Sequence, residues 1–110
     1  MEKDRRSAPL ARVKLEARWE GVHSRENATV TDLSRSGCFV LTGGKVEVKE
    51  LVWLEIQLSD DEKVNFWAEV VDHALEIGFA LKFNSSSSED EAALGKFLEG
   101  IFKSQSQKLT

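Results

Sequence analysis

A short polar string, Asp32-Leu33-Ser34-Arg35-Ser36-Gly37, combines residue types that suit the binding of a small polar ligand. The carboxylate of Asp32 accepts hydrogen bonds, and the hydroxyl of Ser34 accepts and donates them. Gly37 has no side chain, so a ligand or another backbone can approach it closely. Together these groups are suited to holding the edge of a polar ring. Taken alone, the string is more simply interpreted as an ordinary turn between two strands.

Arginines near the amino end supply a second kind of ligand group. Arg5, Arg6 and Arg12 lie just before the first regular segment. Guanidinium groups bind phosphate oxygens, contact guanine O6 and N7 in pairs of hydrogen bonds, and stack on bases. Residues 1–18 carry a charge of +3, and because the whole chain carries −4, residues 19–110 carry −7. This asymmetry suits a small anionic ligand, although a solvated basic tail is the commoner origin of such a run.

The segments that would position these groups show the alternation typical of β-strands. Apolar side chains occupy every second position from Val13 to Trp19, with charged residues between them, as in a strand with one buried face. Comparable apolar or alternating runs, bounded by turn residues, follow at 28–31, 38–41, 52–58, 64–70 and 77–83. We therefore expect six strands, with the polar string between the second and the third.

The carboxyl end shows the pattern of an amphipathic helix. Ser88 and Glu91 have the spacing of a capping box, which predicts a helix start. Apolar residues then recur at helical spacing: Leu94, Phe97, Leu98, Ile101 and Phe102. We expect a helix over 88–103 that covers an open end or face of a small antiparallel barrel, and fraying beyond it. The chain is then one domain: a flexible arginine-bearing segment (1–12), the barrel (13–84) and the helix.

With these elements in place, the sequence resembles the PilZ domain family. That family has an arginine-rich segment before its first strand and an Asp/Asn-x-Ser-x-x-Gly motif at its second, which Asp32, Ser34 and Gly37 match. The resemblance covers most of the chain and implies a mainly β fold, a six-stranded antiparallel β-barrel with a C-terminal amphipathic α-helix. It also implies a non-catalytic bacterial receptor for cyclic di-GMP, with the arginine segment closing over the ligand. The ligand-binding residues expected from it are Arg5, Arg6, Arg12, Asp32, Ser34 and Gly37.

The arginine spacing departs from the family's usual pattern, in which three residues separate two arginines. Here six residues lie between Arg5 and Arg12, and five between Arg6 and Arg12. A looped segment bent at Pro9 would still bring both ends to one ligand. The alternative is a degenerate PilZ-like module that does not bind the nucleotide and works through protein contacts.

Composition argues against several other functions. A net charge of −4 disfavours binding to nucleic-acid polymers, and Ser34 lacks the Gly-x-Ser-x-Gly elbow of a hydrolase. The chain has one cysteine, Cys38, and two isolated histidines, His23 and His73. These residues predict no disulfide, zinc site or catalytic base. Neither a signal peptide nor a membrane span is evident. We expect a cytoplasmic protein that is not an enzyme and needs no metal or cofactor, with cyclic di-GMP and an unidentified protein as partners.

The tryptophans and the polar string give expectations that a structure can test. Trp19 shares the apolar face of its strand and is expected in the core. Trp53 and Trp67 lie opposite the apolar faces of their strands. We expect them beneath the helix, with an exposed surface for a protein partner as the alternative. Asp32 and Ser34 are expected to point towards one outer surface of the barrel.

Overall fold

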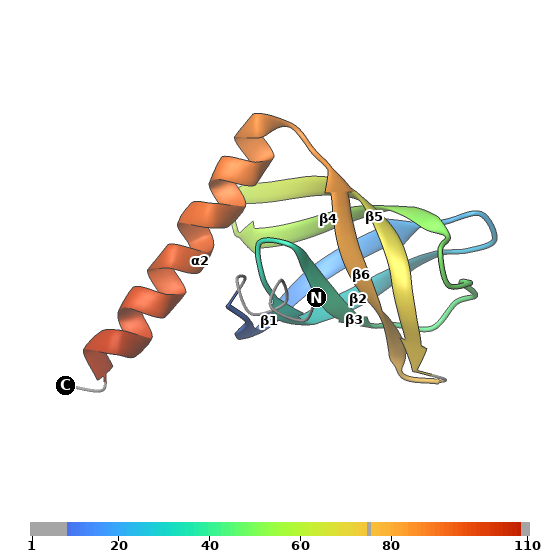
Figure 1. The fold of residues 1–110 in the computed structure, drawn as a ribbon, viewed down its shortest axis with the longest axis horizontal. Helices are drawn as coiled ribbons and strands as arrows, with labels where there is room; N and C mark the ends of the chain where they lie inside the picture. Colours follow the sequence, from blue (N-terminus) through green and yellow to red (C-terminus); the bar gives the residue numbers. More distant parts are fainter. Residues whose placement is uncertain (1–8, 75, 109–110) are drawn as a thin grey trace, which may run out of the picture.

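Alternating apolar residues give each strand one buried face, and the strands close into an antiparallel barrel (Figure 1). The structure, a computed structural model, describes residues 9–74 and 76–108. In chain order the elements are β1 (Ala11–Glu20), β2 (Arg25–Leu33), β3 (Gly37–Leu41), β4 (Leu51–Ser59), β5 (Glu62–Ala74), β6 (Gly78–Ser85) and α2 (Ser88–Lys108). The strands follow the order β1-β2-β3-β6-β5-β4 around the barrel. The expected six-stranded barrel with a C-terminal helix is confirmed.

The barrel interior is filled by the alternate apolar residues of all six strands. At one end of it the buried Trp19 ring meets Phe79 edge to face, with ring centroids 5.1 Å apart. The indole Nε1 of Trp19 donates a hydrogen bond to Oγ1 of Thr42 at 3.0 Å. Since a buried indole N–H without a partner would be costly, this bond lets the ring lie in the core.

The helix begins one residue away from the predicted capping box. The Oγ of Ser87, not of Ser88, accepts a hydrogen bond from the backbone N–H of Asp90 at 3.0 Å, so Ser87 is the N-cap. The side chain of Asp90 in turn accepts a hydrogen bond from the backbone N–H of Asn65 at 3.0 Å. This contact attaches the first turn of α2 to β5.

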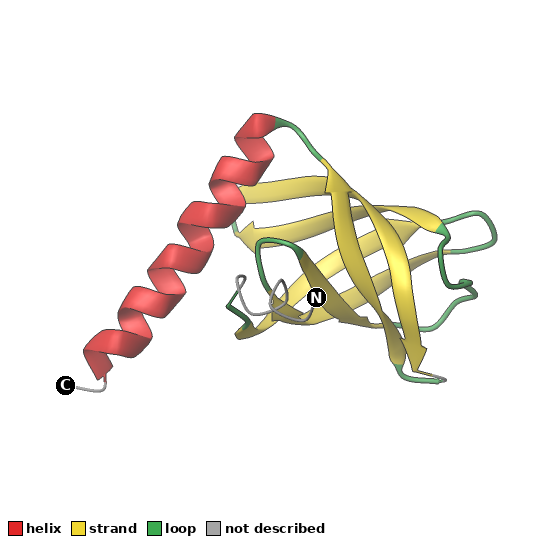
Figure 2. Ribbon diagram, viewed as in Figure 1, coloured by secondary structure: helices red, strands yellow, loops and turns green. Residues whose placement is uncertain are grey.

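The apolar stripe of α2 packs against the barrel, beside which the helix lies in Figure 2. Leu94 and Leu98 are buried, whereas Phe97, Ile101 and Phe102 are partly buried. The helix continues to Lys108, five residues beyond the expected end at residue 103. Among the described residues, no helix combines the length and apolarity needed to cross a membrane.

The expectation that Trp53 and Trp67 lie beneath the helix is wrong. They face each other across β4 and β5 on the outside of the barrel, 37% and 47% exposed. Alternation explains this placement, because the neighbours Val52 and Leu54 point into the core. The helix covers other apolar residues, and the tryptophans remain accessible to solvent.

Candidate functional site

The first component of the site is a pair of opposite charges across β1 and β2. The strand register places Arg12 opposite Asp32, and Nε of Arg12 lies 3.4 Å from Oδ1 of Asp32. The two side chains are 91% and 32% exposed. So exposed a pair adds little to stability, but it holds a guanidinium group on the outer surface near the start of β1. The expected outward placement of Asp32 is confirmed.

The expectation that Ser34 also faces outward is wrong, because its side chain closes the turn. Ser34 is 5% exposed. Its Oγ accepts hydrogen bonds from the backbone N–H groups of Ser36 and Gly37 at 3.1 and 3.2 Å. A contact of 3.3 Å to the carbonyl oxygen of Gly37 gives the hydroxyl an acceptor as well. In this conformation Ser34 shapes the loop that follows Asp32 and presents no free group to a ligand.

Gly37 is required by strand packing. A Cβ atom at this position would collide with the carbonyl oxygen of Leu81 on β6. The backbone N–H of Phe83, also on β6, donates to the carbonyl of Ser36 at 2.8 Å. The close approach that Gly37 permits is therefore that of β6, which fixes the turn against the barrel.

Arg35, which the sequence analysis did not single out, connects this turn to the helix. A Cβ atom added to Gly95 of α2 would lie 2.8 Å from both Nη1 and Nη2 of Arg35. The guanidinium group therefore lies directly over the helix backbone at Gly95. A crevice of about 270 Å³ lies beside this contact, with Phe83 and Glu91 among its lining residues. A glycine beside the apolar stripe of an expected helix was the signal in the sequence that a neighbour approaches there.

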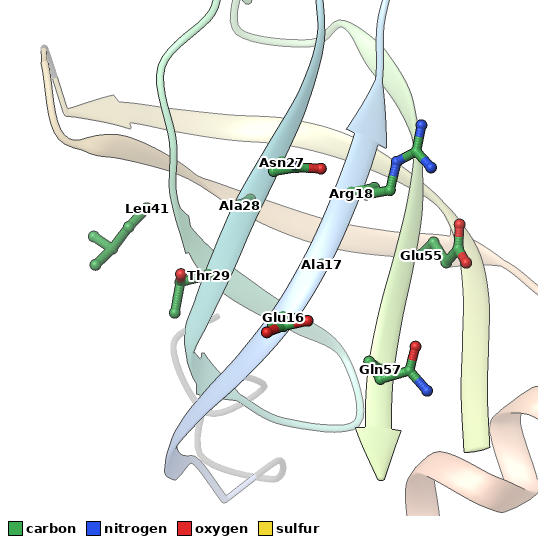
Figure 3. A pocket seen from close by; sticks show the side chains of 9 residues that line it. All are labelled: Glu16, Ala17, Arg18, Asn27, Ala28, Thr29, Leu41, Glu55 and Gln57. Atoms are coloured by element: carbon green, nitrogen blue, oxygen red, sulfur yellow. The ribbon is translucent and has the colours of Figure 1, made fainter. Parts of the chain in front are cut away.

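A larger hollow lies on the outside of the barrel, across β1, β2 and β4 (Figure 3). Its volume is about 520 Å³, and its polar side chains come from β1, β2 and β4. The residues that line it are Glu16, Ala17, Arg18, Asn27, Ala28, Thr29, Leu41, Glu55 and Gln57. It includes neither Arg12 nor Asp32. Because the motif residue Asp32 and the arginine that faces it lie outside the hollow, we place the candidate site at the Arg12–Asp32 pair.

The remaining residues considered in the sequence are placed as follows. Arg5 and Arg6 lie outside the described residues. Cys38 is buried, and burial raises the pKa of its thiol, so the thiolate needed for nucleophilic chemistry is disfavoured at neutral pH. Within 9–74 and 76–108, no group of three or more His, Cys, Asp or Glu side chains is arranged to hold a metal ion.

A family model described as the PilZ domain matches residues 4–100. The chain belongs to the PilZ domain family. The match begins in the arginine-bearing segment, includes the Asp32–Gly37 motif and extends into α2. The motif, the barrel and most of the helix are therefore features of a PilZ domain.

Two solved structures share this PilZ fold. The Bacillus subtilis inhibitor of motility, MotI/DgrA, is similar with a TM-score of 0.74 and 19% identity, over 94% of this chain and 52% of that one. The PilZ domain of CeSA from a cellulose-synthesising bacterium gives a TM-score of 0.63 and 14% identity, over 88% and 98%. The present chain spans about half the length of the MotI/DgrA chain. No curated protein sequence matches the chain.

Proposed function

We propose that this PilZ domain is a non-catalytic receptor for cyclic di-GMP. PilZ domains form a family of cyclic di-GMP receptors. The observation that carries the proposal for this chain is the Arg12–Asp32 pair, an exposed guanidinium group held beside a carboxylate at the family's motif. We also propose that the domain works in the cytoplasm, as is typical of PilZ proteins.

The chemistry of the ligand assigns a role to each group. A guanidinium group binds a phosphate oxygen or the O6 and N7 edge of guanine, and Arg12 has donors beyond the Nε that faces Asp32. A carboxylate accepts the N–H groups of a guanine ring, which is the role we propose for Asp32. Ser34 and Gly37 act indirectly, since they hold the loop that follows Asp32.

The amino-terminal arginines complete the proposed site. Arg5 and Arg6 add two cations close in sequence to Arg12, and the ligand carries two phosphate groups. Ordering this segment on the ligand would cost conformational entropy, so ligand binding would change the surface that the segment presents. This change in order is how we propose that the receptor transmits its signal.

Isothermal titration of the whole chain with cyclic di-GMP tests the proposal. We expect saturable binding that GMP does not reproduce, because a single nucleotide offers only one phosphate and one base. The absence of binding at high micromolar ligand would contradict the proposal.

The competing function is a protein-interaction module that has lost nucleotide binding. The exposed Trp53–Trp67 pair favours it, since such aromatic residues are enriched at protein interfaces. Binding of a partner protein that is unaffected by Arg6→Ala, Arg12→Ala or Asp32→Asn, together with no titration signal from cyclic di-GMP, would support this module over the receptor.

A further inference from the structure

An exposed apolar strip crosses the outside of β4 and β5. It consists of Leu51, Trp53, Trp67 and Val71, which are 51%, 37%, 47% and 46% exposed; we call these four residues the tryptophan face. Trp53 lies directly opposite Trp67, with ring centroids 5.1 Å apart and planes inclined by 64°. Leu51 lies opposite Glu69, so it is diagonal to both Trp67 and Val71. The four side chains therefore form one continuous strip.

Carboxylates surround this strip. Glu20 of β1 lies opposite Trp53, Glu69 lies opposite Leu51, and Glu55 follows Trp53 on the same face of β4. Two of the three carboxylates are partly neutralised by exposed cations, Glu20 by an Arg25 contact of 3.5 Å and Glu55 by a Lys63 contact of 2.8 Å.

Glu69 differs from the other two carboxylates. It forms no ion pair with any of the described residues, although Lys82 lies opposite it on β6. Glu69 is therefore the carboxylate among these three that no ion pair within the described residues neutralises.

We propose that the tryptophan face docks an arginine-bearing segment of a partner protein. A guanidinium group stacks favourably on an indole ring, and carboxylates beside the ring attract the same cation. Residues 19–110 carry a charge of −7, which also favours a basic partner.

This face is separate from the proposed nucleotide site. Trp53 is in register with Glu20 at the end of β1, whereas Arg12 lies at its start, eight residues away or roughly 26 Å along the strand. A partner segment on the tryptophan face would therefore leave the Arg12–Asp32 pair accessible.

NMR of the indole N–H signals of the whole chain tests this docking. The chain has three tryptophans, and the buried Trp19, hydrogen-bonded to Thr42, is an internal control. The probes are a short peptide of arginine, leucine and serine and a matched peptide in which glutamate replaces each arginine. We expect the arginine peptide to move the Trp53 and Trp67 signals saturably, in a salt-sensitive way, while the Trp19 signal stays in place. The glutamate peptide should move none of them.

Three variants locate the binding. Trp67→Leu should weaken binding of the arginine peptide by about tenfold, and Glu69→Gln should weaken this binding a few-fold. Glu62→Gln, the same charge change at an exposed position of the β4–β5 hairpin, should leave it unchanged. Cyclic di-GMP titrations of all three variants should match the unmodified chain, so this test is independent of the proposed receptor function.

Several outcomes would overturn the proposal. They are the absence of any Trp53 or Trp67 shift, equal shifts with the glutamate peptide, or equal loss of peptide binding in Glu62→Gln. Shifts of these two signals with protein concentration alone would assign the face to a second copy of the chain.

Discussion

Arg12 is the residue on which the proposed nucleotide site most depends. It is held by Asp32 at 3.4 Å on the ordered strand β1, whereas Arg5 and Arg6 are adjacent in sequence, so one can substitute for the other. Arg12→Ala should weaken cyclic di-GMP binding by about ten- to a hundred-fold, the usual loss for a charge-assisted contact. Arg5→Ala and Arg6→Ala should each have a smaller effect.

The matched control for Arg12 is Arg18→Ala, since Arg18 is an exposed arginine on the same strand. Titration calorimetry of the four variants gives the order directly. Unchanged affinity in Arg12→Ala would show that the altered spacing has removed this arginine from the site.

Ser34 should affect stability more than ligand contact. Its hydroxyl is the acceptor for two backbone N–H groups of the turn, of which that of Gly37 is buried, and leaving a buried donor without a partner costs about 1–3 kcal/mol. Ser34→Ala should lower the free energy of unfolding by that amount in urea denaturation. Ser59→Ala, at an exposed position whose hydroxyl forms no hydrogen bond within the described residues, should change it little. If Ser34→Ala kept full stability but lost affinity for cyclic di-GMP, Ser34 would have to contact the ligand directly.

Cys38 gives the protein an alkaline sensitivity. Burial raises the pKa of the Cys38 thiol far above its ordinary value, so above about pH 8.5 the unfolded chain loses a proton that the folded chain keeps. The free energy of unfolding should therefore fall as pH rises from 8.5 to 10, by at most about 1.4 kcal/mol per pH unit from this thiol. Cys38→Ala should have a shallower slope in denaturant titrations over this range, and an unchanged slope would mean that the thiol ionises in the folded protein.

At the scale of the elements, α2 contains two glycines in different surroundings. A Cβ at Gly100 would meet nothing within 4 Å, whereas a Cβ at Gly95 would press on the guanidinium group of Arg35. Alanine is favoured over glycine within a helix by up to about 1 kcal/mol. Gly100→Ala should therefore stabilise the protein by nearly that amount, and Gly95→Ala by less, because Arg35 must first move away.

A double-mutant cycle isolates the Arg35 contribution. On an Arg35→Ala background, Gly95→Ala and Gly100→Ala should stabilise the protein equally in urea denaturation. A persistent difference would mean that another neighbour of Gly95 limits the substitution.

The elements were predictable where their pattern is local. Two-residue alternation is enough to assign six strands and to put Val52 and Leu54 inside, because it reports which side chains share a face. The same alternation placed Trp53 outside, and the wrong expectation arose from assigning the helix to cover it. The contact between Arg35 and Gly95 depends on how a turn packs on a distant helix, and only the unexplained glycine hinted at it. For Ser34, residue type was a poor guide because the same hydroxyl serves a turn or a ligand equally well.

At the scale of the whole molecule, the basic segment and the core residues lie in different parts of the sequence. We therefore expect ligand binding and stability to depend on different residues. Among the described residues the buried core begins at Ala11, while the basic segment that precedes it contributes Arg5 and Arg6. Deletion of residues 1–8 should therefore leave the midpoint of thermal unfolding nearly unchanged, because every core residue within the described ranges is kept. The same deletion should weaken cyclic di-GMP binding more than either single substitution, Arg5→Ala or Arg6→Ala, since neither arginine remains to replace the other. Calorimetric melting and titration of the same sample measure both quantities, and undiminished affinity would restrict the site to Arg12 and Asp32 on the barrel.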